Sequence, residues 1–385
     1  MYGILGHLTQ YNCPRTQVYV VRILWMVPIY SITSWLAMRW IEYAVLFETV
    51  RDAYESYVLY SFLQFLIEVL GGEESLICLL KDKSPTRGFH MWGLQWFMEP
   101  WLMGQPMRRA NDHVVQWESP FFRSCKLGVL QYVLTKLLCA AAILIMEGMD
   151  VYNEGTFSWQ SGYLYVCIVT NISQCWALYC LIFFYYATKT ELGPIRPVGK
   201  FLAVKALVFF TWWQAVSVSV LVQIDFIKDY DEKHNGEAVA KVIQNYLICI
   251  EMFLAAVVHT VVFPHSEYSM AAVRARASAL QRTIPFPQQK RLGRAGRKRR
   301  SLSESTNQDS IEMLSLGELS EGEPSENRPG FLGALWDSAW PSDLQENTVN
   351  LIRGEYRFAS KTLLHHAVTS DTYDLFSRIK DNDSP

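Results

Sequence analysis

The sequence predicts an all-α fold: a polytopic membrane helix bundle with six spans, followed by a largely disordered cytoplasmic tail. Two observations lead to this prediction. Half of the 385 residues are hydrophobic and 14% are aromatic, and these residues are concentrated before residue 265. Six apolar stretches there approach the ~20 residues that a helix needs to cross the hydrocarbon core of a bilayer. The residues beyond 264 are rich in Ser and Glu and are too polar to build a core.

The spans are expected at residues 18–38, 54–70, 127–146, 162–187, 201–224 and 242–263. The fourth is the clearest, because no charged residue or His occurs between Gly155 and Thr188. The second is the weakest, since it is short and carries Glu55 and Glu68 near its ends. A soluble protein with buried helices is the alternative, and six runs of this length argue against it.

The distribution of Lys and Arg predicts an orientation, because cytoplasmic loops are enriched in both. Basic residues gather in the loop at 71–126, in the segment 188–200 and in the tail, whereas the loop at 153–161 has none. We therefore expect an integral protein of the plasma membrane or an endomembrane with both termini in the cytoplasm. Residues 1–264 form the bundle and residues 265–385 form the tail in this prediction.

The cytoplasmic loop contains a run rich in Trp and Met between His90 and Met103. Because Trp prefers the headgroup layer of a bilayer, one hypothesis places this run on the inner membrane surface. An equally open alternative is that it packs against the bundle or a partner. The tail carries a basic run that ends at Arg299 and Arg300, which would attract anionic lipids. Phosphorylation of the adjacent Ser301 and Ser303 would weaken that attraction.

Several ordered blocks indicate a family. They include Arg22-Ile-Leu-Trp-Met-Val-Pro-Ile-Tyr30, Arg51-Asp-Ala-Tyr-Glu55, Ser161-Gly-Tyr-Leu-Tyr165, Pro197-Val-Gly-Lys-Phe201 and Gln244-Asn-Tyr-Leu-Ile-Cys-Ile-Glu-Met252. This series resembles the transmembrane protein 184 family, which shares a fold with the alpha subunit of the organic solute transporter. The resemblance covers roughly Tyr11 to Phe263.

The resemblance implies a seven-helix membrane protein with an extracellular N-terminus, associated with facilitated movement of organic solutes such as steroid-like anions. Family members usually carry a further helix before the segment that matches Asn12 to Gln17, so we expect six helices here and an N-terminus inside the cell. The family loop commonly has a cysteine cluster suited to lipid attachment. Only Cys125 remains near the matching place.

Ionisable residues inside a span are unfavourable, so they usually face the bundle interior, a partner or a water-filled path. From their expected depths, Lys136 and Glu251 predict one ion pair, and Glu68 with Arg22 or Lys205 predicts a second. A cation left over could meet an anionic solute. The alternative is that the pairs only hold helices together.

Polar residues at helical spacing add to this pattern, because Tyr54, Tyr57, Ser61, Gln64 and Glu68 recur every three or four residues and share one helix face. The alternative is ordinary interhelical hydrogen bonding, at about 0.6 kcal/mol per contact. The solute-path hypothesis comprises Arg22, Glu55, Ser61, Gln64, Glu68, Lys136, Asn171, Gln174, Lys205, Gln214 and Glu251.

The sequence therefore predicts a membrane transporter of amphipathic organic solutes. A receptor or scaffold that holds cytoplasmic partners without transport is the alternative. We expect no enzymatic activity, no cofactor, no metal site and no nucleic-acid partner, because the required residue clusters are missing from the sequence. Expected partners are membrane lipids, the organic solute, and either a single-span subunit or further copies of this chain.

Overall fold

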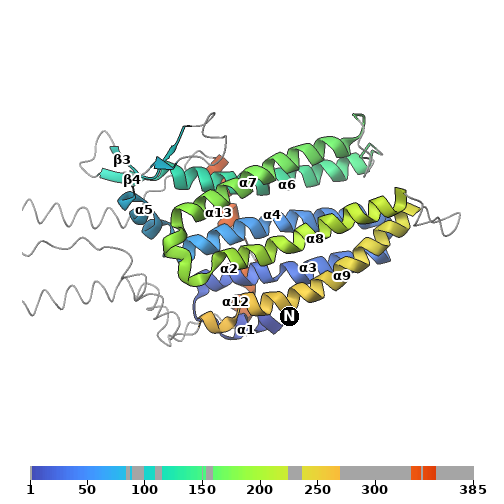
Figure 1. Cartoon of the computed structure of the whole chain (residues 1–385), viewed down its shortest axis with the longest axis horizontal. Coiled ribbons are helices and arrows are strands. Elements are labelled where there is room, and N and C mark those ends of the chain that lie inside the picture. The colour runs from blue at the N-terminus through green and yellow to red at the C-terminus, as the bar shows by residue number, and fades with distance from the viewer. Residues whose placement is uncertain are drawn as a thin grey trace, which may run out of the picture.

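The computed structural model describes residues 2–83, 87–88, 99–108, 115–149, 151–152, 159–223, 236–268, 331–339 and 341–352 of the chain. Helices dominate these residues and run side by side as a bundle (Figure 1). The all-α membrane architecture expected from the sequence is confirmed.

The N-terminal part begins with the short helix α1, Tyr2–Thr9, followed by α2, Pro14–Leu24, and α3, Met26–Arg39. Helices α2 and α3 together form one span with an interruption at Trp25. Pro28 explains the interruption, because a proline ring clashes with the carbonyl group four residues earlier, here that of Leu24, and has no N–H to donate.

Helix α4, Ala44–Val69, follows the short 3₁₀ turn η1, Ile41–Tyr43, and lies at the centre of the bundle between α2, α3 and α6 (Figure 1). Nearly every residue of its C-terminal half is buried. The chain turns after α4 at Gly71, whose φ of 92° lies in the left-handed region that glycine tolerates best. Helix α5, Gly72–Asp82, then leaves the bundle in a new direction (Figure 1).

The loop after α5 contains two small antiparallel ladders. They pair β1, Arg87–Gly88, with β2, Trp101–Leu102, and β3, Gln105–Arg108, with β4, Val115–Glu118.

The remaining helices of the bundle are α6, Pro120–Glu147; α7, Gly162–Leu192; α8, Pro197–Gln223; and α9, Gly236–Val262. The 3₁₀ turns η3, Gly193–Ile195, and η4, His265–Tyr268, follow α7 and α9. Ser119 caps α6 by accepting a hydrogen bond from the Phe122 amide, and Ser161 caps α7 in the same way through Tyr163. Such caps each stabilise a helix start by about 1 kcal/mol.

Five helical segments within the described residues are long and apolar enough to span a membrane, at Pro14–Arg39, Pro120–Glu147, Gly162–Leu192, Pro197–Val218 and Val239–Tyr268. They correspond to five of the six predicted spans. The remaining predicted span, residues 54–70, falls in α4, which is long enough at 26 residues but carries five charged residues. Its polar groups are accommodated because neighbouring helices surround it. Large apolar side chains such as Leu138, Ile172 and Val261 are exposed on the outer helices, as expected for surfaces that face lipid.

The chain segments predicted to be cytoplasmic lie at one end of the bundle. Helix α5, the strands and the junction between α7 and α8 share this end, whereas the C-terminal ends of α3, α6 and α8 lie at the other (Figure 1). Three ion pairs join helices at the first end: Lys83 with Glu191, Lys126 with Glu73, and Lys200 with Glu267.

The structure describes the last five residues of the Trp-rich run, 99–103, which include Trp101. Its ring lies 6.4 Å from Phe121, 6.2 Å from Trp176 and 5.7 Å from Phe183, measured between ring centroids. This residue therefore packs against α6 and α7. Trp92 and Trp96 lie outside the described residues, so the membrane-surface hypothesis stays a prediction for them.

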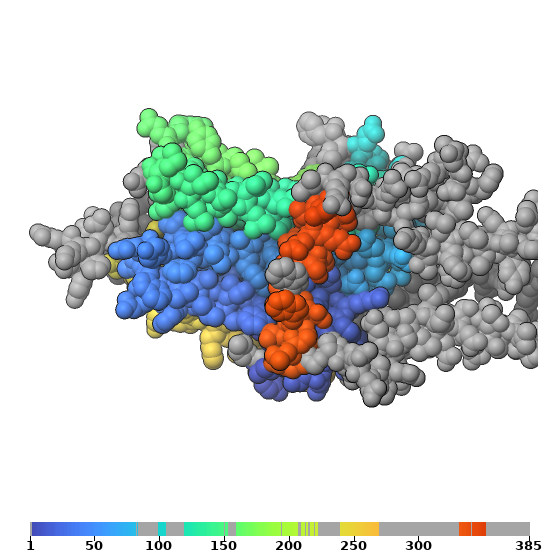
Figure 2. Space-filling view, turned by 180° about the vertical axis from the view of Figure 1, so that it is seen from behind, coloured from blue at the N-terminus to red at the C-terminus, as the bar shows by residue number. Residues whose placement is uncertain are grey.

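Two segments of the predicted tail are helices that pack on the bundle: α12, Phe331–Ala339, and α13, Ser342–Ile352. Figure 2 shows them, in orange-red, crossing one face of the bundle over its blue N-terminal helices. Ala334 is completely buried, and Leu335, Leu344 and Leu351 pack against the core. Residues 331–339 and 341–352 of the tail are therefore folded on the bundle.

Candidate functional site

The polar face of α4 lies against α2. The Tyr54 hydroxyl donates a hydrogen bond of 2.6 Å to the backbone carbonyl of Arg22. The ring of Tyr57 lies under the Arg22 guanidinium, at 5.8 Å between the ring centroid and Cζ. Ser61 and Gln64 are buried further along the same face. The helical spacing thus places these residues together, as expected.

Arg22 is the most constrained cation of this region, because its side chain is only 3% exposed. Its Nη1 lies 2.7 Å from Oδ1 of Asp343 on α13. Its Nε and Nη2 each donate a hydrogen bond of 3.2 Å, to the backbone carbonyls of Ser338 and Asp337 on α12. The ring of Tyr19 lies 5.2 Å from the same guanidinium. The tail helices therefore supply acceptors in three directions around this cation.

A cavity of about 330 Å³ opens beside Arg22. The bundle contributes Pro14, Arg15, Val18, Tyr19, Arg22 and Glu68 to its lining, and α12 and α13 contribute Trp336, Asp337, Ser342 and Asp343. The lining combines charges of both signs with aromatic surface. Such a combination suits a ligand that is apolar over most of its area and charged at one end.

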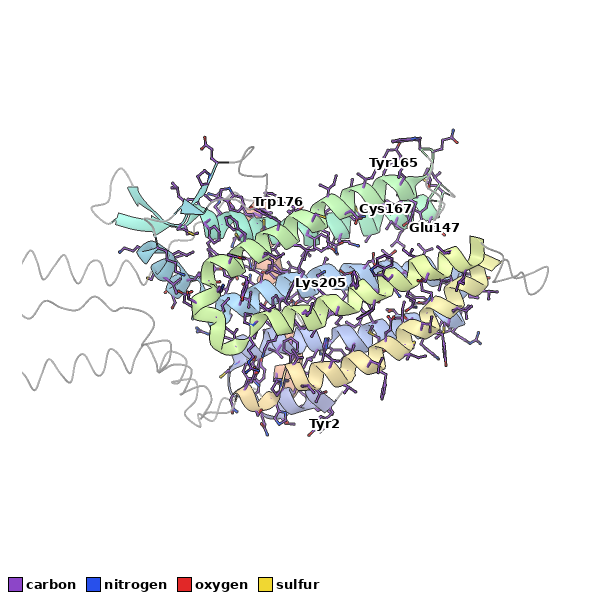
Figure 3. All side chains as sticks on the ribbon, in the orientation of Figure 1. Tyr2, Glu147, Tyr165, Cys167, Trp176 and Lys205 are labelled. Atoms are coloured by element: carbon purple, nitrogen blue, oxygen red, sulfur yellow. The ribbon has the colours of Figure 1, made fainter. Side chains whose placement is uncertain are left out.

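The other side of α4 carries a second set of charges. Asp52 accepts from Lys136 of α6 at 2.9 Å, and Glu55 accepts from Lys205 of α8 at 3.1 Å. Lys205 and Glu55 are 14% and 11% exposed, so this pair is buried within the bundle. Figure 3 shows Lys205 in the middle of the bundle, on the stretch of α8 that runs alongside α4. The predicted path residues of α4 are thus divided between two of its faces, with Glu55 on this side and Ser61, Gln64 and Glu68 on the side of α2.

The predicted pair of Lys136 with Glu251 is wrong, because Lys136 pairs with Asp52. Glu251 of α9 instead accepts a hydrogen bond of 3.3 Å from the Thr211 hydroxyl of α8. The depth of Lys136 in the membrane is compatible with a pair to Asp52 or to Glu251. The rotation of α6 about its own axis, which directs the lysine toward α4, decides between them.

The second predicted pair joined Glu68 to Arg22 or Lys205. Lys205 pairs with Glu55 rather than with Glu68. Arg22 and Glu68 line the same cavity, and Asp343 of the tail pairs with Arg22. The predicted pairing of Glu68 with Arg22 stays a prediction.

The remaining path residues are spread over the outer helices. Asn171 is exposed on α7 and donates to the backbone carbonyl of Cys167 at 2.7 Å, so it faces away from the other members of the set. Gln174 is half-buried on the same helix. Gln214 donates to the backbone carbonyl of Gln244 at 2.9 Å and joins α8 to α9. The structure does not bring these three residues to the Arg22 cavity.

Sequence reasoning missed three polar residues of the interior. Arg51 is 8% exposed and donates to Ser34 Oγ at 3.3 Å and to Asn245 Oδ1 at 3.4 Å. Its position inside the long helix α4 was a usable signal, because charges near the middle of a span are rarely exposed to lipid. Asp343 and Asn347 belong to a polar tail, where a polar residue does not indicate a contact with the bundle.

The proposed lipid and regulatory residues have different outcomes. Cys125 is completely buried, with 0% of its surface exposed, which disfavours lipid attachment at its thiol. Arg299, Arg300, Ser301 and Ser303 lie outside the described residues. Within the part of the chain that the structure describes, no three His, Cys, Asp or Glu side chains form a group that could hold a metal ion.

The chain is similar to known membrane proteins over most of the bundle. The sequence profile of the organic solute transporter Ostalpha family matches residues 1–268. Three *Arabidopsis thaliana* proteins are similar to 70–71% of the chain: Protein LAZ1 homolog 1 at 37% identity, Protein LAZ1 at 35% and Protein LAZ1 homolog 2 at 33%. The matches cover 54%, 56% and 64% of those proteins, so the chain spans about half to two thirds of their length.

No solved structure matches this chain significantly. The LAZ1 proteins belong to the transmembrane protein 184 family, so the resemblance drawn from the sequence blocks is confirmed. With a profile match across the entire helix bundle, the chain belongs to the organic solute transporter Ostalpha family of membrane transporters.

Proposed function

We propose that this chain transports amphipathic organic solutes, with steroid-like molecules as the model class, across the membrane in which it is embedded. The observation that carries the proposal is the buried polar face of α4, which leads to the cavity at Arg22. Interhelical hydrogen bonds account for single polar groups in a membrane bundle, but ionisable residues inside spans, such as Arg22 and Glu68 beside this cavity, usually mark a substrate or ion path. Membership in the transporter family supports the same conclusion.

The solute would bind with its apolar body against the aromatic lining and its polar end toward Arg22. Tyr19 and Tyr57 supply ring surface next to that cation. The Glu55–Lys205 and Asp52–Lys136 pairs lie on the other side of α4, and they would hold α4 against α6 and α8 while the α2 side carries the solute. We further propose that both termini face the cytoplasm, which puts the Arg22 cavity toward that side.

The test is solute flux into liposomes that contain the purified chain alone. We expect uptake of a radiolabelled steroid monosulfate, and a loss of about tenfold when Gln64→Leu and Glu68→Gln are combined, because interactions in the path are lost. The matched control is Asn171→Leu, since Asn171 faces outward and its replacement should leave flux unchanged.

The outcomes separate the alternatives. Unchanged flux in the Gln64/Glu68 variant, at normal protein abundance, would remove the α4 face from the path. Absence of flux from liposomes holding the chain alone, together with flux after addition of a single-span subunit, would show that a partner is needed. Absence of flux under both conditions would favour the receptor or scaffold function.

A further inference from the structure

The tail helices contact the Arg22 guanidinium with the same kinds of acceptor group that an acidic ligand would offer. The Asp343 carboxylate lies 2.7 Å from Nη1, and two backbone carbonyls of α12 accept from Nε and Nη2. Hydrogen bonds between ionised groups are about twice as strong as neutral ones. The contact is distant in sequence, because Asp343 is 321 residues from Arg22. A segment beyond the helices matched by the family profile therefore provides the counterion of a buried bundle residue.

A second contact fixes α13 on the bundle. Asn347 donates to the Tyr60 hydroxyl of α4 at 2.6 Å, and Gln64 donates to the same hydroxyl at 2.8 Å. Gln64 belongs to the proposed path. Helix α13 thus contacts the bundle at two points, Arg22 and Tyr60, on the face that the tail helices cross (Figure 2).

The charges of the cavity show what α12 and α13 contribute. The bundle supplies two cations, Arg15 and Arg22, and one carboxylate, Glu68. The tail helices supply two carboxylates, Asp337 and Asp343. Without the tail helices, the bundle side of the cavity would carry one net positive charge, which matches a ligand with a single negative charge.

We infer that Arg22 is an anion-binding residue, and that the segment 331–352 closes this site by placing the Asp343 carboxylate where the acidic group of a monoanionic amphipathic solute would bind. The inference rests on the proposed transport function and specifies the regulation of that site. A solute carboxylate or sulfate would compete with Asp343 for the guanidinium. Binding of the solute and docking of α13 are therefore mutually exclusive.

The geometry favours an exchangeable contact over a permanent one. Asp343 is 21% exposed and Arg22 is 3% exposed, so the tail residue is the less buried partner and Arg22 is the one fixed in the bundle. On helix α12, Leu332 and Trp336 remain 76% and 68% exposed. The two helices thus bury only part of their apolar surface.

The test uses the full chain and two probes, a radiolabelled steroid monosulfate and its uncharged parent steroid. Asp343→Asn keeps the shape of the side chain and removes the competing charge. We expect it to bind the sulfate about tenfold more tightly than the unmodified chain, which corresponds to one charge-assisted hydrogen bond. Asn347→Ala loosens α13 without touching Arg22 and should act in the same direction.

Two controls complete the design. Glu346→Gln removes a charge from an exposed position of α13 and should leave binding unchanged. Arg22→Gln combined with Asp343→Asn should abolish the gain. Affinity for the uncharged steroid should be equal in all variants, and thermal unfolding in detergent shows whether each variant is folded.

Binding and flux distinguish the two proposals. If the chain transports solute but Asp343→Asn and Asn347→Ala bind the sulfate no more tightly, the closed-site inference is overturned and the transport function stands. If sulfate binding follows the expected pattern while no variant transports, the anion site stands and the transport function fails. A gain that persists after Arg22→Gln also overturns the inference, because the anion would then bind elsewhere.

Discussion

The Lys205 ammonium of α8 lies 3.1 Å from the Glu55 carboxylate of α4, and both side chains are almost completely buried. The pair connects the central helix to a helix that the sequence places 150 residues later. Because removal of either charge leaves the other without compensation in an apolar interior, the pair determines whether α4 and α8 stay together.

We expect Glu55→Gln alone to lower the free energy of unfolding by about 3 kcal/mol, the typical effect of breaking a buried ion pair. The double variant Glu55→Gln/Lys205→Met should be more stable than this single variant, since no unpaired charge remains. Thermal unfolding in detergent measures both effects. Lys189→Met is the control, because Lys189 is exposed at the end of α7. If the double variant lost as much free energy of unfolding as Glu55→Gln and Lys205→Met lose together, the two residues would not interact.

A double-mutant cycle can test the corrected partner of Lys136. We expect Lys136→Met and Asp52→Asn to show a coupling free energy of about 0.5 kcal/mol, a modest value because Asp52 is 51% exposed. The cycle between Lys136→Met and Glu251→Gln should show no coupling. Coupling of Lys136 to Glu251 without coupling to Asp52 would instead support the pair that was predicted from depth in the membrane.

These pairs illustrate what the sequence could and could not predict. The spans were predictable, because a bilayer requires long apolar helices and this requirement is local in the sequence. The shared polar face of α4, with Ser61 and Gln64, was predictable from helical periodicity. The partner of Lys136 was not, because Asp52 and Glu251 lie on different neighbouring helices and only the rotation of each helix decides which one is met.

The role of the tail was hidden for a different reason. Helix α13 contains mostly polar residues, and composition alone favours disorder for such a segment. Its order depends on specific tertiary contacts, such as those of Asp343 and Asn347 with residues more than 280 positions earlier. No local pattern in the sequence encodes a contact of that kind.

Close packing between α6 and α7 gives a further prediction. A Cβ atom added at Gly128 would overlap the Cys180 sulfur and lie 3.1 Å from the Cys180 Cβ and 3.2 Å from Trp176 Nε1. We therefore expect Gly128→Ala to lower the free energy of unfolding by about 1–3 kcal/mol, the usual effect of overpacking. Cys180→Ala removes the sulfur and should restore part of the loss in the double variant. Unaltered thermal unfolding of Gly128→Ala would contradict the tight approach of the two helices.

The orientation of the chain can be tested with inserted glycosylation tags. If both termini are cytoplasmic, a flexible tag with an acceptor Asn, inserted at the exposed Trp159 before α7, should be glycosylated during membrane insertion. The same tag at the N-terminus should not be. A mass shift that a glycosidase reverses provides the measurement. Glycosylation of the N-terminal tag alone would reverse the orientation and place the Arg22 cavity toward the outside.

The last prediction concerns His7, which joins α1 to the end of α9. His7 is completely buried, and its Nε2 lies 3.1 Å from the carbonyl oxygen of Phe263. Burial lowers the pKa of His7 below its ordinary value of 6.5, and the nearby His265 and Lys200 lower it further, while the Phe263 carbonyl and Glu267 oppose them. The folded state therefore holds this ring neutral.

The sign of the pH dependence follows from this lowered pKa. Near pH 7.5 the ring is neutral in the folded and unfolded states, so the contact is fully stabilising. As the pH falls below 6.5, the unfolded state binds a proton more readily than the folded state, and the free energy of unfolding decreases until the pH passes the pKa of the folded state. We expect the melting temperature in detergent to fall between pH 7.5 and pH 5, and to fall less in His7→Gln, which keeps a donor for Phe263 but does not titrate. Equal pH slopes for the two proteins would show that another group controls the acid sensitivity of the bundle.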